Sequence, residues 1–282
     1  MNEHRTIKQV YKSKPTLEGA GVHLKRAFGY WEAPQFDPFL LLDDFHSANP
    51  ADYMPGFPWH PHRGIETVTY MLHGEVEHGD SLGNKGVIES GDVQWMSAGS
   101  GIVHQEMPLK SETQLWGLQL WINLPAARKM SAPQYREIKR SQIPGIEYSD
   151  GVRMKVIAGK IGDTQGPAQD IAVDPEYLDI VISPYQKFAY SIKKGYTVFA
   201  YVLDGQGFFD YKSTELMSPE SLILYDDGEQ LQITARHTPL HFLLISGKPI
   251  GEPVAWRGPI VMNTNEELQL AFQEYHDGTF IK

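Results

Sequence analysis

Short runs of β-branched and aromatic residues, broken by Gly, Asp and Asn, recur along the whole chain and predict strands rather than long helices. The first half contains such runs at residues 68–72, 87–88, 93–96 and 115–122. The second half contains them at residues 152–158, 179–182, 198–203, 221–225 and 241–245. This rhythm predicts an all-β protein made of antiparallel barrels or sandwiches.

The two halves of the chain also resemble each other. The segment Gly64–Gly74 aligns with Gly195–Gly205, and the residues at 64/195, 70/201, 72/203 and 74/205 are identical. After a slip of two residues, Val93, Trp95 and Gly99 align with Leu222, Leu224 and Gly228. Self-similarity of this kind predicts a duplicated domain.

A connector and a terminal helix complete the expected organisation. Residues 124–148 contain several prolines and no sustained strand period, which favours a linker with a short helical turn. We therefore expect one barrel at 1–130, a linker at 131–147 and a second barrel at 148–282. Near the end, a capping box of Thr264 and Glu267, a helical apolar stripe and Gly278 predict a helix that covers a barrel surface.

Composition narrows the function. The 282 residues include 35 acidic and 25 basic side chains, a formal net charge of −10, which disfavours direct binding to nucleic acid. There is no cysteine, so any metal must accept His nitrogens and carboxylate oxygens. The charged N-terminus lacks an apolar core, and the longest apolar runs fall far short of the ~20 residues of a membrane span. We expect a cytoplasmic protein with no membrane partner.

Two pairs of polar residues suggest a metal site. In an extended strand, residues two apart point to the same face, so His60 and His62 present two imidazoles side by side, and His104 and Glu106 do the same. If the two strands are neighbours, three nitrogens and one oxygen converge. Such a donor set suits Fe, Mn, Ni, Cu or Zn, and an octahedral ion would keep two positions for water, oxygen or substrate.

Other histidines fit a metal site less well. With 11 His in the chain, about 0.7 His-x-Glu pairs are expected by chance, and a second one exists at His73 and Glu75, where strand parity and Gly74 indicate a turn instead. We expect the histidines without a partner at ligand spacing to be surface or hydrogen-bonded core residues: His23, His46, His78, His237, His241 and His276.

The duplication provides an internal control. By the alignment above, the second-half positions equivalent to His60, His62, His104 and Glu106 are Ser191, Lys193, Ile233 and Ala235. All four donors are therefore missing together from the second copy. A complete set in one copy and none in the other favours a functional site in the first barrel over structural histidines.

The residues around these pairs are similar to a known family. The runs HPHRGIETVTY (60–70) and GDVQWMSAGSGIVHQEMP (91–108) closely resemble motifs of the pirin family of bicupins, and the likeness covers nearly the whole chain. The resemblance implies two tandem jelly-roll-like cupin barrels with a C-terminal helix. It further implies one metal, usually iron, at His60, His62, His104 and Glu106, and a second barrel that has lost its metal. Family members act as quercetin dioxygenases or as regulators with protein partners.

Several residues near the motifs stay open to more than one interpretation. Glu66 has the ordinary cupin spacing His-x-His-x3-Glu but lies ~13 Å beyond His62 on a regular strand, so we expect it beside the ligands, or as a substitute ligand if Gly64 forms a bulge. Phe57, Trp59 and Trp95 are candidate pocket-lining residues, although aromatic residues in a barrel are more often core.

The leading hypothesis is an oxygenase similar to quercetin 2,3-dioxygenase that cleaves a flavonol or another small aromatic substrate with O2, with Glu106 as the catalytic base. Iron is the first choice of metal because of the resemblance, and Zn, Ni, Cu and Mn are alternatives because the same donors bind them. The second hypothesis is a regulatory, redox-sensing protein whose metal controls binding to a protein partner. A sugar isomerase or sugar-binding cupin is a more distant third.

Overall fold

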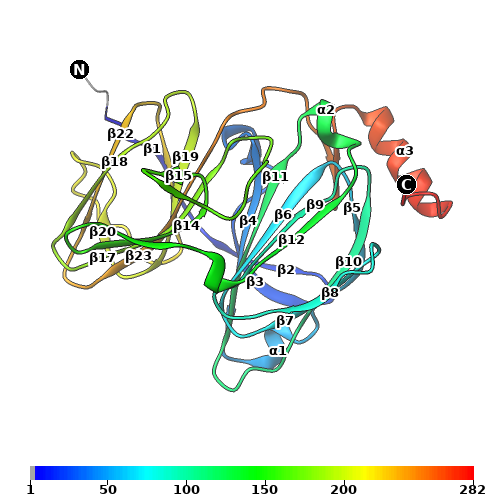
Figure 1. Ribbon diagram of the computed structural model, residues 1–282, viewed down its shortest axis with the longest axis horizontal. Coiled ribbons are helices and arrows are strands. Elements are labelled where there is room, and N and C mark those ends of the chain that lie inside the picture. Colours follow the sequence, from blue (N-terminus) through cyan, green and yellow to red (C-terminus); the bar gives the residue numbers. More distant parts are fainter. Residues whose placement is uncertain (1–3) are drawn as a thin grey trace. The chain divides into compact units, whose positions relative to one another are not determined.

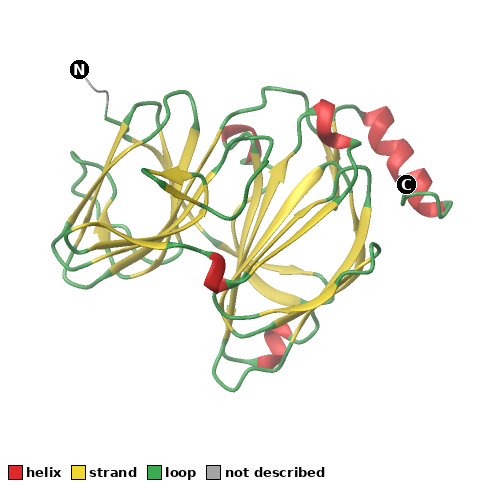
Figure 2. Cartoon of the chain, viewed as in Figure 1, coloured by secondary structure: helices red, strands yellow, loops and turns green. Residues whose placement is uncertain are grey.

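The computed structural model describes residues 4–282 and is built mainly from strands (Figure 2). Its helical elements are short: α1 (Pro50–Tyr53), α2 (Ala126–Lys129), α3 (Asn265–His276) and the 3-10 turns η1 (Ala33–Gln35) and η2 (Arg140–Gln142). Among these described residues, no helix has the length and apolar character needed to cross a membrane. The predicted all-β class is confirmed.

The first unit comprises residues 14–140 and 250–282. Its larger sheet has seven strands in the order β12-β9-β6-β11-β4-β3-β2, and its smaller sheet has four in the order β5-β10-β7-β8 (Figure 1). The strands are β2 (Lys14–Glu18), β3 (Val22–Phe28), β4 (Phe39–Ser47), β5 (Phe57–His62), β6 (Ile65–His73), β7 (Val76–Asp80), β8 (Lys85–Ile88), β9 (Val93–Ser97), β10 (Ile102–Pro108), β11 (Leu115–Asn123) and β12 (Gln134–Ile138), with the hairpin β24 (Ala255–Arg257) and β25 (Ile260–Met262).

The second unit comprises residues 4–13 and 141–249 of the described chain. Its larger sheet has the order β1-β21-β19-β23-β17-β14-β13, and a smaller sheet has the order β18-β22-β20. The strands are β1 (Ile7–Lys12), β13 (Gly145–Ser149), β14 (Val152–Ala158), β17 (Glu176–Ile182), β18 (Lys187–Ser191), β19 (Thr197–Asp204), β20 (Gly207–Phe208), β21 (Ser221–Tyr225), β22 (Gln230–Ala235) and β23 (Leu240–Gly247), with the hairpin β15 (Lys160–Ile161) and β16 (Thr164–Gln165).

The two units share one topology. Strand for strand, β12-β9-β6-β11-β4-β3-β2 corresponds to β1-β21-β19-β23-β17-β14-β13, and the pair β5-β10 corresponds to β18-β22. Two antiparallel sheets in each unit form the double-sheet arrangement of a jelly roll. The expected barrels therefore take the form of two tandem two-sheet cupin domains, and the duplication inferred from the sequence is present in the fold.

The division of the chain differs from the expected boundaries of 1–130, 131–147 and 148–282. Strand β1 pairs with β21 of the second unit, at the edge that β12 occupies next to β9 in the first unit. The expected linker contains β12 and part of β13 as well as the turn η2.

The chain end also lies in the other unit. Residues 250–282 belong to the first unit, where α3 buries Leu268 and Ala271 against Ile260 and Met262. The helix itself has the predicted capping box of Thr264 and Glu267.

The interiors of the two units differ. In the second unit one large apolar cluster, which includes Phe188, Phe209 and Phe242, fills the structure. The first unit buries two histidines, His62 and His104, among its apolar residues. Because buried polar groups require partners, these histidines mark the candidate site.

Candidate metal centre

Strands β5 and β10 bring three histidines together. They pair in antiparallel register with His104 opposite His60, and His62 lies two residues along the same strand. One ring nitrogen from each of the three lies within 4.8 Å of the others. The ring centroids are 4.4 Å apart for His60 and His104 and 5.0 Å apart for His62 and His104. Three of the four predicted donors thus converge as the strand pattern indicated.

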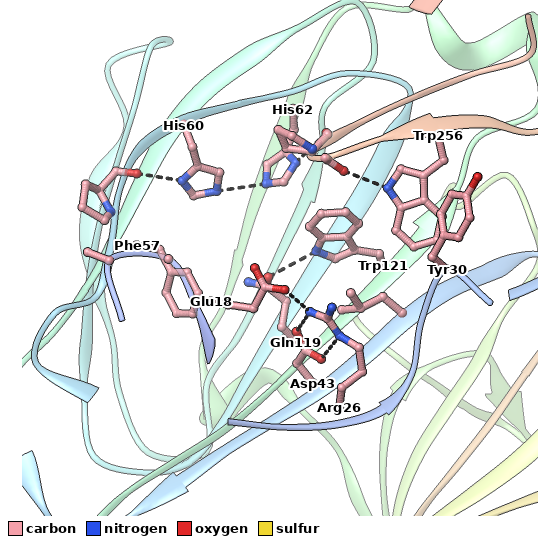
Figure 3. A pocket seen from close by; sticks show the side chains of 16 residues that line it. Glu18, Arg26, Tyr30, Asp43, Phe57, His60, His62, Gln119, Trp121 and Trp256 are labelled. Carbon is pink, nitrogen blue, oxygen red and sulfur yellow. Dashed lines mark hydrogen bonds and ion pairs between the residues drawn. The ribbon is translucent and has the colours of Figure 1, made fainter. Parts of the chain in front are cut away.

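Hydrogen bonds to backbone carbonyls fix the orientation of two rings. The Nδ1 atom of His60 lies 2.8 Å from the carbonyl oxygen of Pro58, and Nδ1 of His62 lies 3.0 Å from that of Pro259. A carbonyl oxygen only accepts, so each Nδ1 carries the hydrogen and each Nε2 keeps its lone pair. The two Nε2 atoms are 3.1 Å apart (Figure 3). Two lone pairs at this distance repel each other unless a cation lies beside both.

The third ring has no hydrogen-bond partner within residues 4–282. His104 is completely buried, and neither of its ring nitrogens makes a hydrogen bond. Burial lowers the pKa of all three histidines, and for His62 and His104 the neighbouring imidazoles lower the pKa further. Neutral imidazoles with converging lone pairs are the form in which histidine binds a metal, so this donor set fits a divalent cation.

Glu106 lies on β10 beyond His104 and is buried. Its Oε1 accepts a hydrogen bond of 2.7 Å from the Thr69 hydroxyl, and its Oε2 accepts one of 2.8 Å from the Gln119 amide. The carboxylate is not part of the group of nitrogens that lie within 4.8 Å. Its role as fourth donor stays a prediction.

Glu66 does not join the histidines. Gly64 has a φ of +76°, and after this turn the chain enters β6 of the larger sheet, whereas His60 and His62 lie in the smaller sheet. The buried Glu66 carboxylate accepts a hydrogen bond of 3.1 Å from the Trp95 indole, and burial raises its pKa. Its assignment as an alternative ligand stays a prediction.

A cavity of about 530 Å³ opens beside His60 and His62. Of the predicted lining residues, Phe57 lines it, whereas Trp59 and Trp95 do not. The reason is a bulge in β5, where Glu106 pairs with Phe57 but His104 pairs with His60. The extra residue turns Phe57 inward with the histidines and leaves Trp59 half exposed, while Trp95 is fully buried.

Sequence reasoning missed most of the other lining residues. Gln119 and Trp121 project from β11, where alternation along the strand was the available signal. Trp256 and Pro259 come from the C-terminal hairpin, which is far from the histidines in sequence, and no local sequence pattern predicts their position at the cavity. An ion-paired cluster also lines the cavity, consisting of Glu18, Arg26 and Asp43 (Figure 3).

Two further histidines, His73 and His78, test how well spacing along the sequence predicts which histidines lie at the site. His73, expected in a turn, is the last residue of β6 and is exposed. His78 is buried, lies 3.3 Å from Asp80 through Nε2, and its ring centroid is 5.5 Å from that of His104. The expectation of a hydrogen-bonded core residue is met, but the His-x-Asp spacing of residues 78 and 80 was the available signal of its position next to the candidate ligands.

In the second unit the equivalent positions are apolar. Strands β18 and β22 pair with Ile233 opposite Phe188, as His104 pairs opposite His60, so Phe188 and Tyr190 occupy the places of His60 and His62. The sequence alignment had placed Ser191 and Lys193 there. It was wrong because Gly64 follows His62 by two positions, whereas Gly195 follows Tyr190 by five. The absence of ligands in the second copy holds with either alignment.

Comparison with known proteins places the chain among proteins of one family. The Pirin family model matches residues 21–122, and the model of the Pirin C-terminal cupin domain matches residues 177–281. The chain is 42% identical to a "Pirin-like protein" of Caulobacter vibrioides, with 98% of this chain and 99% of the relative covered. It is 40% identical to a "Putative quercetin 2,3-dioxygenase" of Pseudomonas aeruginosa, with 99% of both covered.

A solved structure gives the same result. The crystal structure of a quercetin 2,3-dioxygenase from Acinetobacter baumannii superimposes with a TM-score of 0.90 at 32% identity, with 99% of each chain covered. The likeness therefore includes both units.

Proposed function

The chain belongs to the pirin family, and on this premise we propose that it is a metal-dependent dioxygenase that cleaves a flavonol such as quercetin with O2. The observation that carries the proposal is the set of three neutral imidazoles with converging lone pairs beside a cavity large enough for a flavonol. The names of several relatives support the same activity class.

In this proposal His60, His62 and His104 hold one divalent metal, with iron as the first choice and Glu106 as the fourth donor. Nickel, copper, zinc and manganese suit the same donors. When bound, the metal supplies the charge that stabilises a deprotonated substrate hydroxyl, and the redox chemistry needed for O2.

The protein side chains handle the proton and the orientation of the substrate. Glu106 accepts the proton of the substrate hydroxyl, and Thr69 and Gln119 hold its carboxylate in place through hydrogen bonds of 2.7 and 2.8 Å. The Trp121 indole donates to the Gln119 oxygen at 3.2 Å, which fixes the amide so that its NH2 group faces Glu106. Aromatic walls of the cavity stack against a flat ring system and keep bulk water away from it.

Quercetin turnover and metal content test the proposal together. Iron-loaded protein in air should bleach the flavonol absorbance, and elemental analysis of protein purified without chelator should find one metal per chain. His60→Ala should lose both properties. His73→Ala is the matched control, because His73 is exposed and outside the cluster, and it should retain both. Equal bleaching by wild type and His60→Ala would contradict the proposal.

The regulatory hypothesis remains the second candidate, because several relatives at about 40% identity are named only as pirin-like proteins. It requires a protein partner whose binding depends on the metal. A pull-down that recovers the same proteins with metal-loaded and chelator-treated protein would contradict it. Either role is proposed for the cytoplasm, which cell fractionation would check.

A further inference from the structure

One wall of the cavity carries a compact group of charges. Arg26 on β3 pairs in register with Asp43 on β4, and the guanidinium donates two hydrogen bonds to the carboxylate, at 2.8 Å from Nε and 2.7 Å from Nη2. The same Nη2 lies 2.8 Å from Oε1 of Glu18. We call Glu18, Arg26 and Asp43 the acidic cluster, because two carboxylates share one guanidinium.

At its own end of the cavity, the acidic cluster leaves no free cation. The lining residues include one arginine and no lysine, and that arginine is already bound by both carboxylates. A carboxylate, sulfate or phosphate of a ligand at this end would thus meet a net negative charge instead of an unpaired guanidinium. A hydroxyl group, by contrast, can donate a hydrogen bond to a carboxylate.

Glu18 is the accessible acceptor of the group. Its side chain is 41% exposed, compared with 27% for Arg26 and 8% for Asp43. A carboxylate offers about four lone-pair sites, and Arg26 contacts one oxygen of Glu18, so acceptor capacity remains. The Glu18 carboxylate is therefore the part of the acidic cluster that a ligand can reach.

A glycine holds Glu18 at the cavity. Gly19 has a φ of +57°, and a Cβ at this position would lie 2.5 Å from the carbonyl oxygen of Gly56 and 2.7 Å from the Phe57 ring. Only glycine lets the turn after β2 pack this closely against Phe57, which itself lines the cavity. The position of Glu18 is thus built into the backbone rather than left to a mobile surface loop.

The cavity therefore has two chemically distinct ends. Figure 3 shows His60 and His62 on one side and the acidic cluster on the other, with Trp121 between them and Trp256, Tyr30 and Phe57 around the rim. A flat aromatic ligand fits such walls, with one polar group at the histidines and another near Glu18.

We propose that Glu18 is a specificity-determining residue that accepts a hydrogen bond from a ring hydroxyl remote from the metal, so that the site selects neutral polyhydroxylated aromatics and rejects their anionic derivatives. The proposal rests on the proposed function, because it assumes that the substrate oxygen binds at the histidines.

Ligand binding without turnover tests this inference. Quenching of tryptophan fluorescence under nitrogen measures the affinity for quercetin and for 3-hydroxyflavone, which has the same ring system and the same 3-hydroxyl but lacks the hydroxyls on the two outer rings. Wild-type protein should bind quercetin more tightly. Glu18→Gln should weaken the affinity for quercetin about fivefold, which is the typical difference between a hydrogen bond to a charged acceptor and one to a neutral acceptor. The same variant should change the affinity for 3-hydroxyflavone less than twofold. Glu112→Gln, an exposed acidic residue that does not line the cavity, is the control and should change neither.

A third ligand tests the charge argument. Quercetin carrying a sulfate on one ring hydroxyl should bind wild type at least tenfold more weakly than quercetin, and Glu18→Gln should reduce this discrimination because the cluster becomes neutral. Equal loss of affinity for quercetin and 3-hydroxyflavone in Glu18→Gln, or tight binding of the sulfate by wild type, would overturn the inference. Selective binding without bleaching would remove the proposed function alone, and bleaching without selectivity would remove this inference alone.

Discussion

The interiors of the two units show how one scaffold supports opposite uses of the same positions. In the first unit, Nε2 of His60 faces Nε2 of His62, and His104 beside them makes no hydrogen bond with any described residue. In the second unit, Phe188, Tyr190 and Ile233 occupy the corresponding places and belong to the apolar core. The strand order of the larger sheets corresponds, and β5 pairs with β10 as β18 pairs with β22, so the fold does not require histidine at these positions.

This difference has an energetic meaning. Buried nitrogens without partners destabilise a fold, whereas buried aromatic and aliphatic side chains stabilise it. The apolar side chains at these positions of the second unit are therefore the kind that stability alone would favour. The first unit retains polar groups that a bound cation would satisfy. The experiments below test this difference between the two interiors, in order of decreasing expected effect.

Converting the first interior into the second should abolish metal binding. The triple variant His60→Phe, His62→Tyr and His104→Ile copies the side chains of the second unit, and metal content should fall from one ion per chain to none. The metal-free variant should melt at or above the temperature of metal-free wild type, because the unsatisfied nitrogens are gone. Elemental analysis and thermal unfolding check both points, and retained stoichiometric metal would refute the assignment of the site.

Truncation of the second core should affect stability without touching the metal. Phe188 is fully buried in the large cluster, and Phe188→Ala should reduce the free energy of unfolding by about 3–5 kcal/mol. Denaturant titration measures the loss. Metal content should stay at wild-type level, and a loss of metal in this variant would show that the two interiors are not independent.

A weaker effect is expected from loosening the chain end that holds His62. Arg63, which follows His62 at the end of β5, donates to Glu274 at 2.7 Å and to the Phe280 carbonyl at 2.9 Å. These hydrogen bonds attach the C-terminal segment, which carries Pro259, to the end of β5. Glu274→Gln should raise the metal dissociation constant by about tenfold, the lower range for residues that orient ligands. Lys282→Met removes the other partner of Glu274 and should leave the constant unchanged. Competition with a chromophoric chelator measures both, and equal constants for Glu274→Gln and wild type would count against this role.

The smallest expected effect is a pH dependence of stability in chelator-treated protein. Burial places the pKa of His60, His62 and His104 below the value of the unfolded chain, which is about 6.5. Below that pH the unfolded state binds more protons than the folded state, so stability is complete above about pH 6.5 and falls as the pH decreases. The triple variant should show a smaller loss between pH 7 and 5 in denaturant titrations. Identical pH profiles would contradict the buried neutral state of the three rings.

Much of this protein was determined by local sequence. Strand alternation and turn residues predicted the all-β duplication, and the i, i+2 spacing of His60/His62 and His104/Glu106 predicted shared faces, because side chains alternate along every strand. Thr264 and Glu267 predicted the start of the last helix, because a capping box is a local motif.

Long-range pairing decided the rest. The sequence could not show that β1 joins the second unit and residues 250–282 the first, because either edge of either sheet offers the same hydrogen bonds. It also could not align Phe188 with His60, since loop lengths vary freely while strand register does not. Only the tertiary structure brought Pro259 to His62 and Glu18 to the cavity, because these contacts join segments that no local pattern connects.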